Sequence, residues 1–401
     1  MEEKDFKPRL HNGVIEFPVH HMRGGTSVGL VLDKRNVPES ETLQEELLRH
    51  LMGVPLTGEQ IGNKQVTGLG RGTPVTNKVF IVENDMPQRR LVSTLAQLAA
   101  SKSTIDWSVN CGNMSSALPL FALDMGWLPA SGELVEMEIY NTNTQTRMQA
   151  RMHLSQGQLI SDTQIPGVAG CFPGVDLFLN KPMGAKTGKL FPTGNVSDRF
   201  GDIEATCIDV AVPMVIARAT DFGKSGYESP EQLDGDVAFK QALRSLWVEA
   251  GQRMQLRNPK GKPMTCSELE NSETIPKICI ISPARESGDI STRYFTPQNA
   301  HPSLAVSGGC CLASACLIAG TTAYEMSKQG IVLCDTVAEF RVAIENPAGI
   351  LDTIIQAGET SSGAQIEAAA YRRSAQILLR GRMPLYRASE ALKADLAARV
   401  A

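Results

Sequence analysis

The sequence predicts an α+β protein of two similar domains, each a curved, mostly antiparallel sheet around one central helix. Three observations support this fold class. Apolar runs of strand length outnumber helical segments along the chain. Two segments, 110–127 and 307–318, are apolar nearly all round, as expected of a helix enclosed by sheet. A length of 401 residues also exceeds what one hydrophobic core usually serves.

The first half contains several apolar or alternating runs separated by Gly, Asn or Asp, and each predicts a strand. These runs are "VIEFPVHHM", "VGLVLD", "NKVFIVEN", "STIDWSV", "VEMEIYNT" and "MQARMHL". The stretch "SETLQEELLRHLMG" predicts the one clear surface helix of this half. The apolar spacing of 110–127 predicts a buried helix, in which Pro119 must lie near the first turn.

The second half repeats this pattern. Strands are expected in "IEATCIDVAVPMVIARA", "IPKICIIS", "STRYFTP", "EFRVAIEN" and "LDTIIQAG", followed by "AQIEAAAYRRSAQILLRGRMPL". A turn of Ser307, Gly308 and Gly309 is expected to open the second buried helix. Each half therefore holds one buried helix with a small-residue entrance, an architectural repeat with little identity between the halves.

Glycine and proline gather between the halves in segment 180–195, which predicts a crossing from one domain to the other. We therefore expect a first domain over 1–190, completed by 372–401, and a second domain over 191–371.

Composition narrows the class of protein. A formal net charge of −4 argues against a nucleic-acid binder with a basic face, and no apolar run is long enough to span a membrane. The N-terminus "MEEKDFKPRL" lacks the apolar core of a signal peptide, so we expect a cytoplasmic protein. The nine cysteines contain no C-x-x-C pair, and the six histidines lack metal-ligand spacing. We expect no metal and no other cofactor, and we place Cys207 and Cys279 in core strands.

Cys111 lies at the entrance to the first buried helix. The first turn of a helix offers unpaired N–H groups and a partial positive charge, which favour anions and make a thiol more acidic. Two such helix ends facing each other would hold a small molecule with two or more carboxylates. On spacing alone, a small residue at a tight turn explains Cys111 equally well. The candidate contacts at this entrance are Asn110, Gly112, Asn113, Met114 and Ser115.

Five motifs, in order over 19–320, carry a resemblance to a known family. They are "HMRGGTSVGLVL", "GRGTPVTNKVFIV", "WSVNCGNMSSALPLFAL", "LFPTGN" and "HPSLAVSGGCCLASACLIAG". They resemble the cofactor-independent isomerases that include 2-methylaconitate isomerase, 3-methylitaconate isomerase and 4-oxalomesaconate tautomerase, which share the fold of diaminopimelate epimerase. The resemblance implies two similar domains with the active site in the cleft between them. It also implies a 1,3-proton shift that moves a carbon–carbon double bond in an unsaturated di- or tricarboxylate, with Lys78 as base and Cys111 as its partner.

The residues themselves are compatible with these roles. Lys78 follows a turn-rich stretch and begins an apolar strand, where burial and the cations Arg23 and Arg71 would favour a neutral amine. A neutral amine can take a proton from the carbon beside a carboxylate or carbonyl. From sequence alone, an ordinary exposed lysine is the more common case, and the family resemblance reverses that weighting.

The remaining candidates would bind substrate. In "MRGGTS", a glycine turn exposes N–H groups beside the hydroxyls of Thr26 and Ser27, with Arg23 to assist in binding a carboxylate, although a plain glycine hairpin is an equal alternative. His301, just before the second helix, could orient substrate, but a lone His-Pro in a loop is more often structural. Ser307, Gly308 and Gly309 supply the second helix entrance.

Departures from the family pattern leave the substrate open. Val28 stands where the family usually has lysine, "TNK" replaces the common "TSK", and Arg71 replaces the second of two glycines. The segments "ATCIDVAVPMVIARATDFGKSGYE" and "ACLIAG" are more similar to the oxalomesaconate tautomerases than to the methylaconitate or aconitate isomerases. An amino-acid epimerase would need a second thiol where Ser307 is expected, and a non-catalytic carboxylate-binding protein would need no base. The oligomeric state stays open, with a homodimer among the options.

Overall fold

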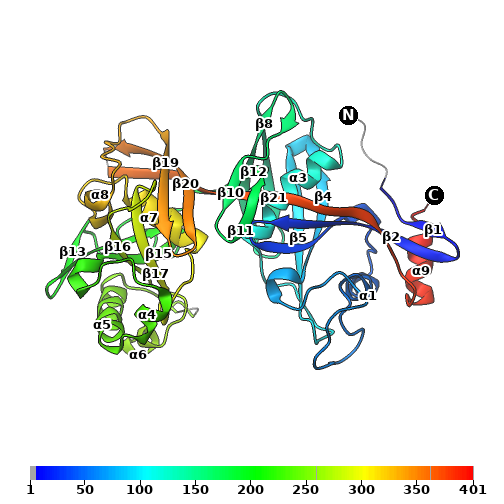
Figure 1. Ribbon diagram of the computed structural model, residues 1–401, viewed down its shortest axis with the longest axis horizontal. Coiled ribbons are helices and arrows are strands. Elements are labelled where there is room, and N and C mark those ends of the chain that lie inside the picture. Colours follow the sequence, from blue (N-terminus) through cyan, green and yellow to red (C-terminus); the bar gives the residue numbers. More distant parts are fainter. Residues whose placement is uncertain (1–5, 259, 362, 401) are drawn as a thin grey trace. The chain divides into compact units, whose positions relative to one another are not determined.

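A computed structural model describes residues 6–258, 260–361 and 363–400 (Figure 1). The chain divides into two compact units. The first consists of the described parts of Met1–Gln164, Val168–Leu177 and Arg373–Ala401, and the second consists of Ile165–Gly167 and Phe178–Arg372. The chain passes to the second unit within a strand, before the segment 180–195 in which the sequence predicts the crossing.

The elements of the first unit follow in chain order. Its strands are β1 (Arg9–His11), β2 (Val14–Gly24), β3 (Ser27–Asp33), β4 (Lys78–Asp85), β5 (Arg90–Leu98), β6 (Ile105–Asp106), β7 (Leu134–Asn141), β8 (Thr146–Ser155), β9 (Gln158–Leu159), β10 (Thr163–Ile165), β11 (Val168–Phe172) and the start of β12 (Gly174–Asn180). Its helices are α1 (Glu41–Met52), α2 (Gly112–Ser115), α3 (Ala117–Asp124) and α9 (Glu390–Ala397), with 3-10 turns η1 (Lys34–Asn36), η2 (Pro74–Thr76) and η3 (Met86–Gln88).

The strand pairings of the first unit form a closed ring. Strand β2 pairs antiparallel with β3, β3 parallel with β4, β4 antiparallel with β5, β5 parallel with β7, and β7 antiparallel with β8. The ring continues through β12 to β21 (Gly363–Pro384), which pairs antiparallel with β2. Helix α3 contacts β2 and β8 and buries Ala117 to Leu123 without exception, which confirms the buried helix that the sequence predicts (Figure 1).

Helix α1 covers the outer face of this ring and is the surface helix that the sequence predicts. It begins after Ser40 and ends at Gly53, whose positive φ of 69° suits a helix C-terminus. Its apolar face joins a core cluster with β2, β3 and β4, to which α9 adds Leu392 and Leu396. The last residues of the chain therefore pack on a helix made near its beginning.

The elements of the second unit are as follows. Its strands are β13 (Asp198–Phe200), β14 (Ile203–Val210), β15 (Val212–Arg218), β16 (Lys277–Ser282), β17 (Ile290–Thr296), β18 (Asn299–Ala300), β19 (Ala338–Asn346), β20 (Gly349–Thr360) and the start of β21. Its helices are α4 (Pro230–Gly235), α5 (Val237–Arg253), α6 (Cys266–Glu270), α7 (Val306–Ala315) and α8 (Thr322–Met326), with the 3-10 turn η4 (Ala219–Phe222).

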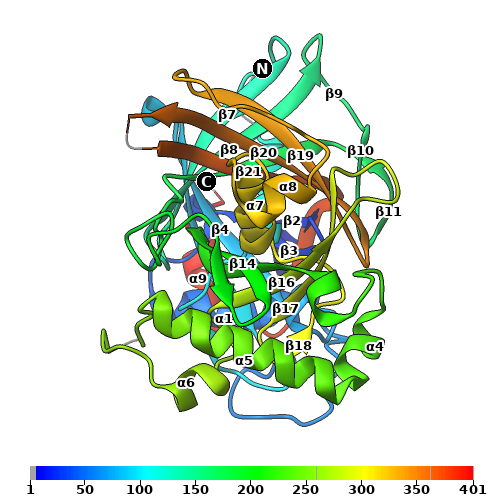
Figure 2. The ribbon, with the colours of Figure 1, turned by 90° about the vertical axis from the view of Figure 1, so that its left-hand side faces the viewer.

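The second unit repeats the strand order of the first. Strand β14 pairs antiparallel with β15, β15 parallel with β16, β16 antiparallel with β17, β17 parallel with β19, and β19 antiparallel with β20. Helix α7 contacts β14, β15, β19 and β20, and Gly308 to Ala315 are buried (Figure 2). The repeat of one buried helix per half, predicted from sequence, is thus present in the strand topology of the units.

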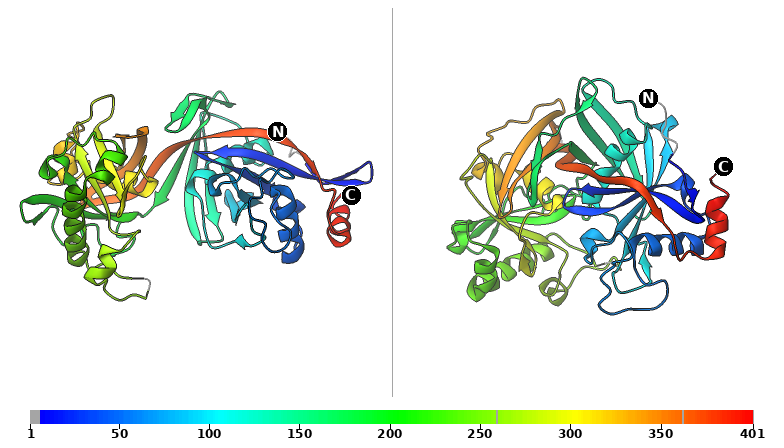
Figure 3. Two further views of the ribbon diagram at one scale, coloured as in Figure 1. Left: turned by 60° about the horizontal axis from the view of Figure 1, so that its bottom comes forward. Right: turned by 45° about the vertical axis from the view of Figure 1, so that its right-hand side comes forward.

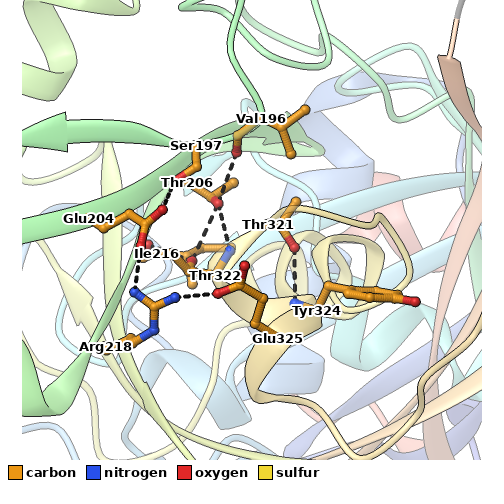
Figure 4. A network of polar contacts seen from close by, with 10 residues as sticks. All are labelled: Val196, Ser197, Glu204, Thr206, Ile216, Arg218, Thr321, Thr322, Tyr324 and Glu325. Atoms are coloured by element: carbon orange, nitrogen blue, oxygen red, sulfur yellow. Dashed lines mark hydrogen bonds and ion pairs between the residues drawn. The ribbon is translucent and has the colours of Figure 1, made fainter.

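Polar contacts join α8, the short helix that follows α7, to the sheet (Figure 4). The backbone N–H of Thr322 donates to Thr206 Oγ1 at 3.0 Å, and Thr322 Oγ1 donates to the carbonyl of Ile216 at 3.0 Å. Nearby, Arg218 pairs with both Glu204 and Glu325. These contacts join α8 to β14 and β15.

Strand β21 carries the chain back from the second unit to the first (Figure 3). It pairs with β20 through Gly363 to Tyr371 and with β2 through Ala375 to Pro384. The sequence places the return to the first domain at 372, and the unit boundary lies at Arg373. One continuous strand therefore serves both units.

Candidate functional site

The turn between β2 and β3 lies directly on the start of α2. A Cβ added to Gly24 would lie 2.7 Å from the carbonyl oxygen of Asn113 and 2.8 Å from that of Met114, so only glycine allows this approach. Gly25 follows with a φ of 53°, which completes the tight turn. The glycines of "MRGGTS" therefore bring the hairpin tip to the helix entrance.

Cys111 is the N-cap residue of α2. Its sulfur accepts a hydrogen bond from the backbone N–H of Met114 at 3.4 Å and lies 3.7 Å from Ser27 Oγ. The N–H of Cys111 donates to Asn110 Oδ1 at 2.7 Å, and Ser115 Oγ donates to the carbonyl of Cys111 at 2.9 Å. The thiol is partly exposed, whereas Met114 and Ser115 are buried. The sequence correctly places Cys111 at a helix entrance.

The helix itself differs from the prediction of one piece beginning near Asn113. It starts at Gly112 and is divided into α2 and α3 at Ser116, whose side chain donates to the carbonyl of Asn113 at 2.7 Å. A serine hydroxyl that competes for a backbone carbonyl in this way is a known cause of helix irregularity. Pro119 then lies in the first turn of α3, the position it requires.

A second group of polar atoms lies beside the thiol. The amide nitrogen of Asn113 donates to Thr26 Oγ1 at 3.2 Å, and Arg373 Nε donates to Asn113 Oδ1 at 2.9 Å. Arg373 is buried and enters from β21, so no local pattern in the sequence points to it. Gly112 is partly exposed at the same entrance.

Lys78 is the first residue of β4 and is 8% exposed. It pairs with Gly29 of β3, where an added Cβ would lie 3.1 Å from the Lys78 Cβ, so both face the same side of the sheet. The ammonium donates to the side-chain oxygen of Gln97, its partner on β5. Gln97 in turn donates to the carbonyl of Asn77 at 3.0 Å, which orients its oxygen toward the amine.

Strand alternation connects Lys78 with the thiol. Ser27 and Gly29 lie on one face of β3, and that face carries both the Cys111 contact and the neighbouring Lys78. Val28 alternates to the other face, where it is the cross-strand partner of Arg23. The valine that departs from the family pattern therefore does not point with Lys78 and Ser27.

Arg23 is buried, and part of its hydrogen-bonding capacity serves the turn itself. Its Nη1 donates to the carbonyls of Gly25 at 2.8 Å and Ser374 at 3.0 Å, and its guanidinium lies 4.5 Å from the ring centre of Phe172. Burial lowers the pKa of Arg23. Its Nη2 has no hydrogen-bond partner within the described residues.

Arg71 is exposed, and its backbone N–H donates to Asn77 Oδ1 at 3.1 Å. Its charge acts on His21 of β2. Burial, and after it the charge of Arg71, lowers the pKa of His21 to about 4. The loop before Lys78 is thus electrostatically coupled to β2.

The candidate residues of the second unit gather at the start of α7. His301 is partly buried, and its Nδ1 accepts a hydrogen bond from the N–H of Ser303 at 3.0 Å. Ser307, Gly308 and Gly309 are not a turn before the helix, as the sequence predicts, but lie inside its first turns, because α7 begins at Val306 after the N-cap Ala305. The N-cap Ala305 has no polar side chain, so the sequence does not show where α7 begins.

The repeat also corrects the alignment of the helix entrances. In each unit a two-residue strand, β6 or β18, precedes the N-cap by the same number of residues, which makes Ala305 the equivalent of Cys111 in the repeat. Ser307, which the sequence aligns with the thiol, lies two positions further on. The conclusion that no second cysteine occupies this position is unchanged.

No helix within 6–258, 260–361 and 363–400 is long and apolar enough to cross a membrane. Over the same described ranges, no three His, Cys, Asp or Glu side chains come together as a metal site would require.

Comparisons with known proteins agree with this picture. The family model described as "PrpF protein" matches residues 14–386. The putative isomerase YbhH of Escherichia coli K12 is 35% identical over 340 residues, which is 84% of this chain and 90% of that protein. The 4-oxalomesaconate tautomerase of Pseudomonas putida is 32% identical over 340 residues, 84% of this chain and 88% of that protein. The crystal structure of a methylitaconate-delta-isomerase has a TM-score of 0.77 at 25% identity, and covers 95% of this chain and 97% of its own. The chain is an isomerase and belongs to the PrpF family.

Proposed function

We propose that this isomerase moves a carbon–carbon double bond of an unsaturated di- or tricarboxylate by a 1,3-proton shift, with a substrate similar to 4-oxalomesaconate. The observation that carries the proposal is the buried amine of Lys78 on the sheet face that also meets Cys111. A tautomerase of that name is 32% identical to this chain. Methylaconitate and aconitate are the second candidates, because they need the same proton shift.

The chemistry requires one base and a stabilised anion. Lys78, in its neutral form, removes a proton from the carbon next to an activating carboxylate or carbonyl, and the electron pair left behind spreads into a dienolate. The ammonium then returns the proton to the far carbon of the three-carbon unit, so the double bond moves and the base is regenerated. The neutral amide of Gln97 can hold the amine without supplying a competing charge.

The groups around Cys111 suit the anionic parts of the substrate. Thr26, Asn113 and Arg373 bring hydroxyl, amide and guanidinium groups to the helix entrance, and none of them is acidic. Hydrogen-bond donors aimed at developing charge are often the largest contribution to such catalysis. We assign Cys111 a secondary role, in which it lines the reacting system, because one base can serve both halves of a shift on one face. That the two units share one active site stays a prediction.

The test is an absorbance assay of the full-length protein on a panel of unsaturated tricarboxylates. The proposed function requires a change in ultraviolet absorbance with 4-oxalomesaconate or a methylaconitate, because the shift changes conjugation. Turnover of a free amino acid instead would point to epimerase chemistry, which the alanine at 305 disfavours. No turnover of any unsaturated polycarboxylate would refute the proposal.

A further inference from the structure

The second unit has its own lysine at the position of Lys78. Lys277 is the first residue of β16, and it pairs with Met214 of the parallel strand β15. In the first unit, Lys78 begins β4 and pairs with Gly29 of the parallel strand β3. The shared strand order makes these two pairs equivalent, although no sequence motif connects the two lysines.

Lys277 faces the central helix of its unit. Alternation along β16 puts it on the same face as Cys279, which is paired with Tyr294 of β17. The intervening residue Ile278 belongs to the core under α5, on the opposite face. The ring of Tyr294 lies against α7, since a Cβ on Gly308 would come within 2.4 Å of it. Lys277 therefore lies on the face that carries the start of α7.

His301 completes a cluster with Lys277 and Tyr294. Its backbone N–H donates to the carbonyl of Tyr294 at 2.8 Å, and the ring centres of the two lie 5.9 Å apart. Because Nδ1 of His301 accepts from the N–H of Ser303, the proton of the neutral ring is on Nε2. Burial lowers the pKa of His301, and the charge of Lys277 is close enough to lower it further.

The groups of this cluster are donors. The ammonium of Lys277 donates one long hydrogen bond of 3.4 Å, to the carbonyl of Glu273. Burial lowers the pKa of Lys277, and no carboxylate among the described residues offsets the effect. The hydroxyl of Tyr294 is buried and has no hydrogen-bond partner within the described chain. A partly desolvated cation without a counter-ion is unfavourable, and a bound anion would relieve this.

We propose that Lys277, with His301 beside it, is a substrate-binding residue that holds one carboxylate of the polycarboxylate in the second unit. The inference rests on the proposed function for the identity of the anion. The two equivalent lysines thus have different tasks. Lys78 transfers a proton, and Lys277 supplies a fixed charge that selects substrates with a further carboxylate.

The test measures binding separately from turnover. Tricarballylate, a saturated tricarboxylate that cannot isomerise, is titrated calorimetrically into the full-length protein, its Lys277→Met variant and its Lys277→Arg variant. Loss of one charge-assisted contact should weaken tricarballylate about 10- to 100-fold in Lys277→Met, whereas Lys277→Arg should stay within a few-fold of the wild type. With an unsaturated substrate, KM should rise in Lys277→Met while kcat changes little.

Lys224→Met is the matched control, because Lys224 is a similarly covered lysine of the same unit that pairs with Asp236, at the start of α5. It should bind tricarballylate like the wild type. Lys277→Gln provides a second removal of the charge if the methionine variant is poorly folded, as judged by its melting curve.

Unchanged tricarballylate binding in a folded Lys277→Met or Lys277→Gln protein would overturn the inference, and so would a wild type that binds no tricarballylate. A wild type that binds tricarballylate through Lys277 but isomerises nothing would sustain the binding site and reject the proposed function.

Discussion

The two units share one strand order and differ at the entrance to their central helices. In the first unit the N-cap is Cys111, whose sulfur accepts a backbone hydrogen bond. In the second unit the N-cap is Ala305, which offers no side-chain cap. Lys78 and Lys277 begin equivalent strands, but Lys78 donates to the amide of Gln97, whereas the charge of Lys277 acts on His301. The repeated strand order gives the two lysines equivalent positions, and the residues around each lysine determine its chemical role.

The strand just before the hairpin turn shows the same divergence. The register places Arg23 of β2 and Asp209 of β14 at equivalent positions. Arg23 donates to carbonyls around its glycine turn, whereas the Asp209 carboxylate accepts from the N–H groups of Lys186 and Thr187 at 2.9 and 2.8 Å. Opposite charges thus perform the same structural task of anchoring a loop.

The largest effect on turnover should come from removing the lysine of the first unit. Lys78→Met should lower kcat by about 10²–10⁴-fold, because it removes the base at similar volume. Lys277→Met should act mainly on KM. The comparison is made by steady-state kinetics on the same unsaturated tricarboxylate. If Lys78→Met kept a near-normal kcat, the assignment of the base to the first unit would be wrong.

Cysteine reactivity should separate the first helix entrance from the core. Cys111 is partly exposed, whereas burial raises the pKa of Cys279 to about 12 and that of Cys207 further still. Peptide-resolved labelling with iodoacetamide near neutral pH should therefore modify Cys111 much faster than either core thiol, and substrate should slow it. Equal rates for Cys111 and Cys207, with no protection by substrate, would contradict the account of the entrance.

Acid should destabilise the first unit through His21. The folded protein holds this imidazole neutral down to a pKa of about 4, whereas the unfolded chain binds a proton near 6.5. Stability is therefore full above pH 6.5 and is lost as pH falls toward 4, by about 3 kcal/mol for this group. Urea unfolding, followed by Trp107 and Trp127 fluorescence in a Trp247→Phe background, should show this loss in the first unit.

His21→Leu should flatten that pH dependence, and His11→Gln, which changes an exposed histidine of the same unit, should leave it as in the wild type. A His21→Leu protein with an unaltered pH profile would show that other groups govern the acid sensitivity.

The smallest effect should come from chelation. Proton transfer by an amine needs no metal, and the sequence shows no metal-ligand spacing in either half. Prolonged treatment with a chelator should leave kcat and KM unchanged, as measured before and after dialysis. Loss of activity that an added metal restores would show that one of the units holds a metal the reaction needs.

Much of the fold could be predicted because its signals are local. The helix Glu41–Met52 and the buried segment after Cys111 have regular apolar spacing, and most strands are apolar runs between turn residues. Helix α5 was missed, although Phe239, Leu243, Leu246 and Trp247 repeat at helical spacing and are buried. The charged residues between them obscured that stripe among many strand-like segments.

The site was only partly predictable. Motifs single out Lys78 and Cys111 as candidates, but their surroundings depend on pairings between distant segments. Gln97 reaches Lys78 through strand register, and Arg373 reaches Asn113 from 260 residues away. The equivalence of Lys277 with Lys78 likewise exists only in the strand topology. Residue identity in one sequence carries no record of such pairings.

The single strand β21 has a consequence for biosynthesis. The ribosome makes most of the first unit early, yet the ring of that unit lacks the strand that joins β12 to β2 until Arg373–Pro384 emerges. The second unit, made almost wholly from Phe178–Arg372, has all its strands before then. Until then the edge of β2 that pairs with β21 has no partner, and another chain could pair with it. The part translated first is the part completed last.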